Sequence, residues 1–155
     1  MILTLAAAGN VQPEWVATMG RRALRKIKPG LDLSCHLKTF DELPRPWDPE
    51  PVFGRRAPLE VEVGSGKGLF MRSAAMERVD VDFLGIEVAP KYAEFAAAGL
   101  AKRERNNAVV FFADAHRGFA GLLAVESLSG VHGYLPDTWG KKSHKKRRVM
   151  RPAVC

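Results

Sequence analysis

An acidic residue and an indole lie directly before a dense run of cations near the end of the chain. Asp137 and Trp139 precede the basic run from Lys141 to Arg151, which holds seven lysines and arginines. A carboxylate can hold a small polar group, an indole can stack on a flat ring, and clustered cations can neutralise phosphates. This order of residue types indicates that the protein acts on a polyanionic substrate.

Each part of this run also has an ordinary explanation. Asp137 could form a turn, Trp139 could belong to the core, and a basic run can be a solvated tail or a localisation signal. Here the basic run follows a predicted strand that ends close to the carboxylate. That position favours a clamp that holds a phosphate backbone beside a reaction site.

A glycine-rich turn forms the second candidate site. Glu62, Gly64, Gly66 and Gly68 follow a predicted strand and precede a predicted helix. Missing side chains there let a ligand approach the backbone and the helix N-terminus. The turn is not a P-loop, because Lys67 is followed by glycine instead of serine or threonine, and its third glycine comes one residue early for a dinucleotide fingerprint. A tight turn without a ligand is the alternative explanation.

Two more acids could complete a cofactor site. Glu87 lies 25 residues after Glu62 at the end of the second predicted strand, where doubly wound folds hold ribose hydroxyls. The turn has no cluster of cations for a pyrophosphate, so a cofactor with one nucleoside and no phosphates fits better than NAD. Asp114 follows the third strand and could accept from an adenine amino group or cap the next helix.

Strands and helices alternate along most of the chain. The hydrophobic pattern predicts strands over 59–63, 83–87, 109–113 and 131–135, and helices over 67–78, 90–104 and 119–127. This alternation is typical of an α/β fold with a parallel sheet, which binds ligands at the carboxyl ends of its strands. Four acids fall at those ends: Glu62, Glu87, Asp114 and Asp137.

The residues before position 59 do not show this alternating pattern of strands and helices. Residues 29–58 contain six prolines, which predicts an irregular lead-in and a folded core that starts near Leu59. We expect residues 1–18 to be an upstream extension with little structural content, 19–58 to be a basic, proline-rich lead-in, and 59–155 to be a partial catalytic domain. The segment 21–28 holds five of the 24 lysines and arginines.

The composition favours one kind of partner and argues against several kinds of site. The net charge of +7 is concentrated in two patches, which favours a nucleic acid as partner. Two cysteines, Cys35 and Cys155, and four histidines without ligand spacing argue against a disulfide framework and a metal site. No apolar run approaches the roughly 20 residues that span a bilayer. A cytoplasmic protein without a membrane partner is expected.

The chain resembles the bacterial tRNA (guanine-N7)-methyltransferases between about residues 19 and 152. The resemblance rests on Pro136-Asp137-x-Trp139-x-Lys141 through Lys146-Arg147-Arg148, and on the order of the strand-end acids. It implies a Rossmann-like class I methyltransferase fold, S-adenosylmethionine as cofactor and tRNA as substrate, with transfer to N7 of a guanine in the variable loop.

The resemblance also implies roles for single residues. Asp137 would be catalytic, and Lys141 would contact the tRNA. Together with the glycine turn, the expected cofactor-binding set is Glu62, Gly64, Gly66, Gly68, Glu87, Asp114 and Asp137. The expected substrate-binding set is Lys141, Lys145, Arg147 and Arg148.

The sequence departs from the family in three places. The family usually has Phe-Pro-Asp-Pro-Trp where this chain has Leu135-Pro136-Asp137-Thr138-Trp139, and Ser143 replaces a common basic residue. The chain ends at Cys155, where family members continue with further strands, so we expect a truncated sheet. With four strands in the order 3-2-1-4, the fourth would be a bare edge prone to self-association.

Two other functions stay open at this point. The chain could be a non-catalytic RNA-binding fragment of such an enzyme. It could also be a methyltransferase that acts on another nucleic acid or on a small molecule, although the clustered charge disfavours this.

Overall fold

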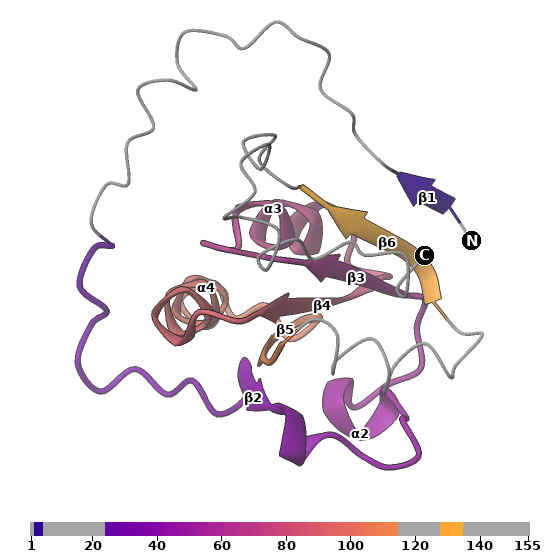
Figure 1. Cartoon of the computed structure of the whole chain (residues 1–155), viewed down its shortest axis with the longest axis horizontal. Coiled ribbons are helices and arrows are strands. Elements are labelled where there is room, and N and C mark those ends of the chain that lie inside the picture. Colours follow the sequence, from indigo (N-terminus) through magenta and orange to yellow (C-terminus); the bar gives the residue numbers. More distant parts are fainter. Residues whose placement is uncertain (1, 5–23, 115–127, 135–155) are drawn as a thin grey trace, which may run out of the picture.

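The computed structural model describes residues 2–4, 24–114 and 128–134. In chain order its elements are β1 (Ile2–Thr4), β2 (Leu37–Thr39), the 3-10 helix η1 (Phe40–Glu42), α2 (Glu50–Phe53), β3 (Leu59–Val63), α3 (Leu69–Glu77), β4 (Asp82–Glu87), α4 (Pro90–Ala101), β5 (Ala108–Phe112) and β6 (Leu128–Gly133) (Figure 1). Strands and helices alternate from β3 to β5. The predicted α/β class is confirmed.

One parallel sheet organises these elements. Its strand order is β1-β6-β3-β4-β5-β2, and every neighbouring pair is parallel. The four central strands therefore have the predicted order. In this register Glu62 of β3 lies opposite Gly85 of β4 and His132 of β6. The strands thus bring residues that are far apart in the sequence to one end of the sheet.

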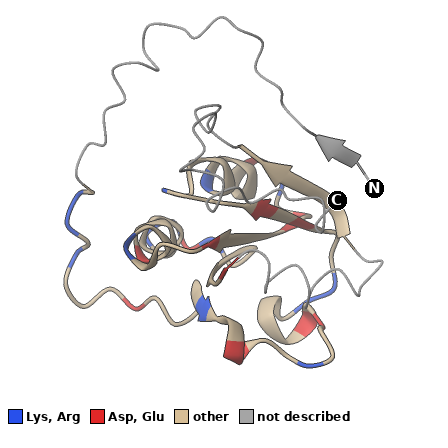
Figure 2. Cartoon of the chain, viewed as in Figure 1, with Lys and Arg blue, Asp and Glu red and all other residues tan. Residues whose placement is uncertain are grey.

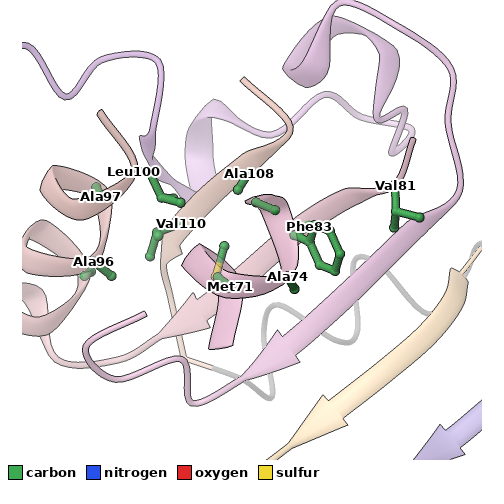
Figure 3. Packing of buried hydrophobic residues seen from close by; sticks show 11 residues of the cluster. Met71, Ala74, Val81, Phe83, Ala96, Ala97, Leu100, Ala108 and Val110 are labelled. Carbon is green, nitrogen blue, oxygen red and sulfur yellow. The ribbon is translucent and has the colours of Figure 1, made fainter. Parts of the chain in front are cut away.

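The helices α3 and α4 cover one face of the sheet. Their small residues Ala74, Ala96 and Ala97 pack with Met71 and Phe83 in a buried cluster (Figure 3). Alanines on α4 let the helix lie close to the strands. At Gly85 a Cβ would lie 2.2 Å from the Met71 sulfur, so α3 packs directly on the backbone of β4. This close packing fixes the start of α3 relative to the strand ends.

The proline-rich lead-in covers the opposite face. Phe40, Leu43, Trp47, Val52 and Phe53 pack against a second buried cluster that includes Val61, Leu84 and Phe111. The rings of Trp47 and Phe111 meet edge to face at 6.3 Å. Among the described residues, the buried hydrophobic side chains begin at Leu59, and the lead-in side chains pack against them while only partly buried. The division of the chain at residue 59 stays a prediction. Prolines break regular elements, but the apolar residues between them still bury their side chains on the exposed sheet face.

The two edges of the sheet also differ from expectation. β2 pairs with β5, and β1 pairs with Gly130, Val131 and His132 of β6. The fourth predicted strand is therefore not a bare edge, because residues 2–4 use its unpaired backbone groups. These three residues lie in the segment that we expected to have little structural content. Self-association stays a prediction.

The bounds of some helices and strands differ by a few residues from the predicted bounds. α3 begins at Leu69 instead of residue 67, because Gly68 has a φ of 66°, outside the helical region. β6 begins at Leu128, earlier than the predicted 131, and so includes Gly130. A Cβ on Gly130 would lie 3.3 Å from Glu60 Cγ, so this glycine makes room for a buried acid. The predicted helix 119–127 lies outside the described residues.

Candidate active site

The turn between β3 and α3 adopts a conformation that glycine allows. Gly64, Gly66 and Gly68 have φ values of 72°, 54° and 66°, which residues with a Cβ rarely adopt. The backbone N–H groups of Gly64 and Ser65 donate to the Ile86 carbonyl at 2.8 and 3.2 Å. The turn is therefore tied to the end of β4, and its backbone is held close to the neighbouring strand.

The last glycine of the turn also sets the helix packing. A Cβ on Gly68 would lie 2.7 Å from Ala96 Cβ of α4. The absence of a side chain lets the start of α3 contact α4 directly. The three glycines that the sequence predicted thus lie together at the carboxyl end of β3, and no side chain covers the Cβ positions of Gly64 and Gly66.

Glu87, at the end of β4, accepts a hydrogen bond from the backbone of this turn. It is the last residue of β4 and is 9% exposed. Its Oε2 accepts from the Gly66 N–H at 2.7 Å, and its Oε1 accepts from the Ala89 N–H at 2.8 Å. Each carboxylate oxygen has a second lone pair. Glu87 is therefore held in place by the backbone and can still accept from ligand hydroxyls.

Glu62 lies deeper at the same end of the sheet and is 5% exposed. Its Oε2 is buried and has no hydrogen-bond partner in the described part of the chain. Burial raises the pKa of Glu62 to about 8, hydrogen bonding to the Met71 backbone opposes that rise, and the charge of Glu87 adds to it. At neutral pH the carboxyl holds a proton, and a cationic donor placed against it would favour the ionised form.

Ser65 adds a second polar atom without a partner. Its side chain is 5% exposed, and its Oγ makes no hydrogen bond within the described ranges. Buried polar atoms are usually satisfied, so two unpartnered oxygens near one glycine turn point to a polar ligand group. Sequence reasoning missed Ser65 because a serine in a glycine-rich turn is ordinary.

Asp114 follows β5 at the same edge as Glu87. The N–H of the preceding residue, Ala113, donates to the Glu87 carbonyl at 3.1 Å. The sheet therefore brings Glu62, Glu87 and Asp114 to the ends of three adjacent strands, as predicted from their spacing. Asp114 itself is exposed.

An aromatic group at the end of β6 was not predicted. The Phe70 ring of α3 lies 5.1 Å from the Tyr134 ring and 4.6 Å from the His132 ring. Tyr134 is 48% exposed, and its pKa is raised by burial and by the charges of Glu62 and Glu60. These residues come from α3 and from the end of β6, far apart in the sequence, so no local sequence pattern could have found them.

The pairing of β3 with β6 also brings Glu60 and His132 together in an ion cluster with Arg78. Glu60 accepts from Arg78 at 2.9 and 2.5 Å, and His132 Nε2 lies 2.8 Å from its Oε2. Burial alone would raise the pKa of Glu60, but the hydrogen bonds of Arg78 and His132 outweigh burial and lower it. This acid is fully partnered, so the cluster braces β3 against α3 and β6.

Comparison with known proteins identifies the family. Residues 56–155 match the model of a family described as "Putative methyltransferase". The chain belongs to this methyltransferase family. Three similar proteins carry the name tRNA (guanine-N(7)-)-methyltransferase. The protein from Rhodopirellula baltica is 48% identical over 143 residues, which cover 89% of this chain and 53% of the relative.

The other two relatives are more distant. The protein from Methylococcus capsulatus is 37% identical over 109 residues, which cover 70% of this chain and 47% of the relative. The protein from Burkholderia thailandensis is 32% identical over 137 residues, which cover 88% and 49%. The chain thus spans about half the length of the curated relatives that it matches.

The residues at the strand ends fit the cofactor of this methyltransferase family. S-adenosylmethionine carries an ammonium group, a sulfonium centre and ribose hydroxyls. The unpartnered Oε2 of Glu62 suits a cationic donor, and Glu87 keeps lone pairs for hydroxyls. The uncovered glycine backbone leaves room for a ligand to approach.

The remaining predicted site residues lie outside the described residues. Asp137 and the predicted substrate contacts Lys141, Lys145, Arg147 and Arg148 come after Tyr134, the last residue that the structure describes. Over residues 2–4, 24–114 and 128–134, no group of three or more metal-ligating side chains is present. No helix within those ranges is long and apolar enough to span a membrane.

Proposed function

We propose that the chain is a tRNA (guanine-N7)-methyltransferase. It would transfer a methyl group from S-adenosylmethionine to N7 of a guanine in the tRNA variable loop, in the cytoplasm. The observation that carries the proposal is the pairing of a glycine turn with two acids: Glu87 is anchored by the Gly66 N–H, and Glu62 has one buried oxygen, Oε2, without a partner among the described residues. The names of the relatives supply the substrate class.

Each acid has a distinct part in holding the cofactor. Glu87 would accept from the ribose hydroxyls, because the backbone already orients its carboxylate. Glu62 would face a cationic group, because its buried oxygen otherwise has no partner. Gly64, Gly66 and Gly68 would let the ligand lie against the backbone, and Asp114 would accept from the adenine amino group.

The reaction needs positioning more than proton transfer. When bound, S-adenosylmethionine supplies an electrophilic methyl group on a positively charged sulfur. Guanine N7 carries an in-plane lone pair, so no residue of the chain has to remove a proton before attack. Asp137 would hold the guanine edge and stabilise the positive charge that develops on the purine. Lys141, Lys145, Arg147 and Arg148 would bind tRNA phosphates, so affinity would fall steeply with salt.

Transfer of labelled methyl to tRNA tests the proposal. The substrate is an unmodified transcript, and the matched control is the same transcript with 7-deazaguanosine, which lacks N7. Label on the normal transcript alone is the expected result. Absence of label from folded protein would refute catalysis by this chain and favour a non-catalytic RNA-binding fragment.

Two substitutions separate the expected roles. Asp137→Ala should abolish transfer but keep cofactor binding, whereas Glu87→Ala should weaken cofactor binding by about tenfold or more, because two anchored acceptors are lost. Glu94→Ala on the exposed side of α4 serves as the control for removing an acid. Normal transfer by the Asp137 variant would remove this residue from the active site.

A further inference from the structure

A basic depression lies between α3, α4 and the segment that precedes Pro29. Its volume is about 230 Å³, and none of the strand-end acids lines it. Five cations line it: Arg25, Lys26, Arg72, Lys102 and Arg103. Figure 2 shows lysines and arginines both on α4 and in the segment that passes it. We name this depression the α3–α4 basic pocket.

Two guanidinium groups of the pocket meet at one point of α4. A Cβ on Gly99 would lie 2.7 Å from Arg72 Cδ, so the Arg72 side chain lies directly across this glycine. Arg103 Nη1 donates to the Gly99 carbonyl at 2.9 Å. Burial lowers the pKa of Arg72, and the charge of Arg103 lowers it further. The fold therefore holds two cations together at an electrostatic cost.

No acid offsets this cost in the part of the chain that the structure describes. The ion pairs found there involve Arg45, Arg55, Arg56, Arg78 and His132, and none of the pocket cations. A group of like charges without a counterion favours binding of an anion, which would remove the repulsion.

Helix dipoles explain the positions of only some of the pocket cations. Lys102 and Arg103 follow the C-terminus of α4, where the helix dipole favours cations. Arg72 instead lies in the first turns of α3, which begins at Leu69, and there the dipole disfavours a cation. Arg25 and Lys26 belong to no helix. The convergence of these three residues with the end of α4 therefore needs another reason.

We propose that the α3–α4 basic pocket binds the phosphate backbone of RNA. This inference rests on the proposed function and adds a second tRNA contact, separate from the basic run after residue 140. Five cations exceed what a single small anion needs, and two of them, Arg25 and Lys26, belong to the basic segment 21–28. A track of this kind suits a chain of phosphates.

The test compares single charge removals on the two faces of the sheet. Arg72→Gln and Lys102→Gln each remove one pocket cation, and Lys102 is exposed, so its variant keeps the packing. Arg56→Gln removes one cation after α2, which lies outside the pocket and is 76% exposed. Binding of a labelled unmodified tRNA transcript to the full chain is measured by fluorescence anisotropy over a series of salt concentrations. Thermal melts confirm that each variant is folded.

Each pocket variant should weaken tRNA binding by about fivefold to tenfold at low salt. It should also reduce the slope of log affinity against log salt by about 1, whereas Arg56→Gln should leave the slope unchanged. Equal effects of all three variants would overturn the inference, since net charge alone would explain them. It would also be overturned if the wild-type chain binds no tRNA, or if the pocket variants bind tRNA normally.

Inorganic triphosphate serves as the small-anion probe. If it binds the wild-type chain and its binding is lost in the Arg72 variant while tRNA binding is kept, the pocket is a small-anion site and the inference is wrong. Methyl transfer is scored separately on the same proteins. A changed salt slope without any methyl transfer would refute the proposed reaction and leave the RNA contact standing.

Discussion

Replacing Glu62 by glutamine should change how the stability of the protein depends on pH. The carboxyl is 5% exposed and one of its oxygens has no partner among the described residues. Glutamine has nearly the same shape but cannot ionise. Its buried amide hydrogens cost some stability, and that cost is the same at every pH. The difference between the two proteins therefore reports the ionisation of Glu62 alone.

The size of the effect follows from the pKa. The ordinary pKa of a glutamate carboxyl is 4.5, and burial raises the pKa of Glu62 in the folded chain to about 8. Between these values the unfolded chain binds fewer protons than the folded chain, so stability falls as pH rises. At about 1.36 kcal/mol per pKa unit, the loss between pH 5 and pH 8 is about 3–4 kcal/mol. Typical domains have only about 5–15 kcal/mol of stability.

Urea denaturation at several pH values between 5 and 8 measures this effect. The free energy of unfolding of Glu62→Gln, minus that of the wild type, should rise by about 3–4 kcal/mol across this range. Glu94→Gln is the matched control, because this acid on α4 is exposed, and its difference from the wild type should stay constant. If the Glu62→Gln difference also stays constant, Glu62 ionises in the folded chain as it does in water, and the argument from burial is refuted.

Three further predictions concern the same end of the sheet and its support. Gly68→Ala should lower stability by about 2–4 kcal/mol, because its Cβ would lie 2.7 Å from Ala96 Cβ at a φ of 66°; a melt equal to that of the wild type would contradict this. Asn107→Ala should cost about 2–3 kcal/mol in urea denaturation, since Asn107 Nδ2 donates to three backbone carbonyls, and a loss under about 0.5 kcal/mol would mean that water replaces them. Binding of S-adenosylmethionine at pH 7 should release up to about 0.9 proton from Glu62, given its pKa of about 8; calorimetry in two buffers of different ionisation enthalpy measures this release, which should vanish in Glu62→Gln.

The sequence was sufficient to predict the central sheet and the acids at its end. Apolar runs of strand length separated by helical patterns predict parallel strands, and the carboxyl ends of parallel strands place Glu62, Glu87 and Asp114 at one edge. The glycine spacing predicted the turn because only glycine adopts its three positive φ values readily. These features depend on local residue types, so a single sequence carries them.

Features that depend on long-range packing could not be predicted in this way. The six prolines of residues 29–58 did not show that Trp47 packs against Phe111. The contact between Glu60 and His132 joins residues 72 positions apart, and it exists only because β3 and β6 pair in one register. The pocket on α3 and α4 likewise needs Gly99 beside Arg72, which no spacing rule suggests.

Glu60 and Glu62 show why an unpartnered acid is informative in this protein. Both acids belong to β3, two positions apart, and both are nearly inaccessible to solvent. The fold gives Glu60 two partners, Arg78 and His132, and its pKa is lowered although burial opposes this. Glu62 has no such partner within the described residues, and its pKa is raised. The same strand can therefore satisfy a buried carboxylate, so the unsatisfied one at the glycine turn is better explained by a cationic ligand than by poor packing.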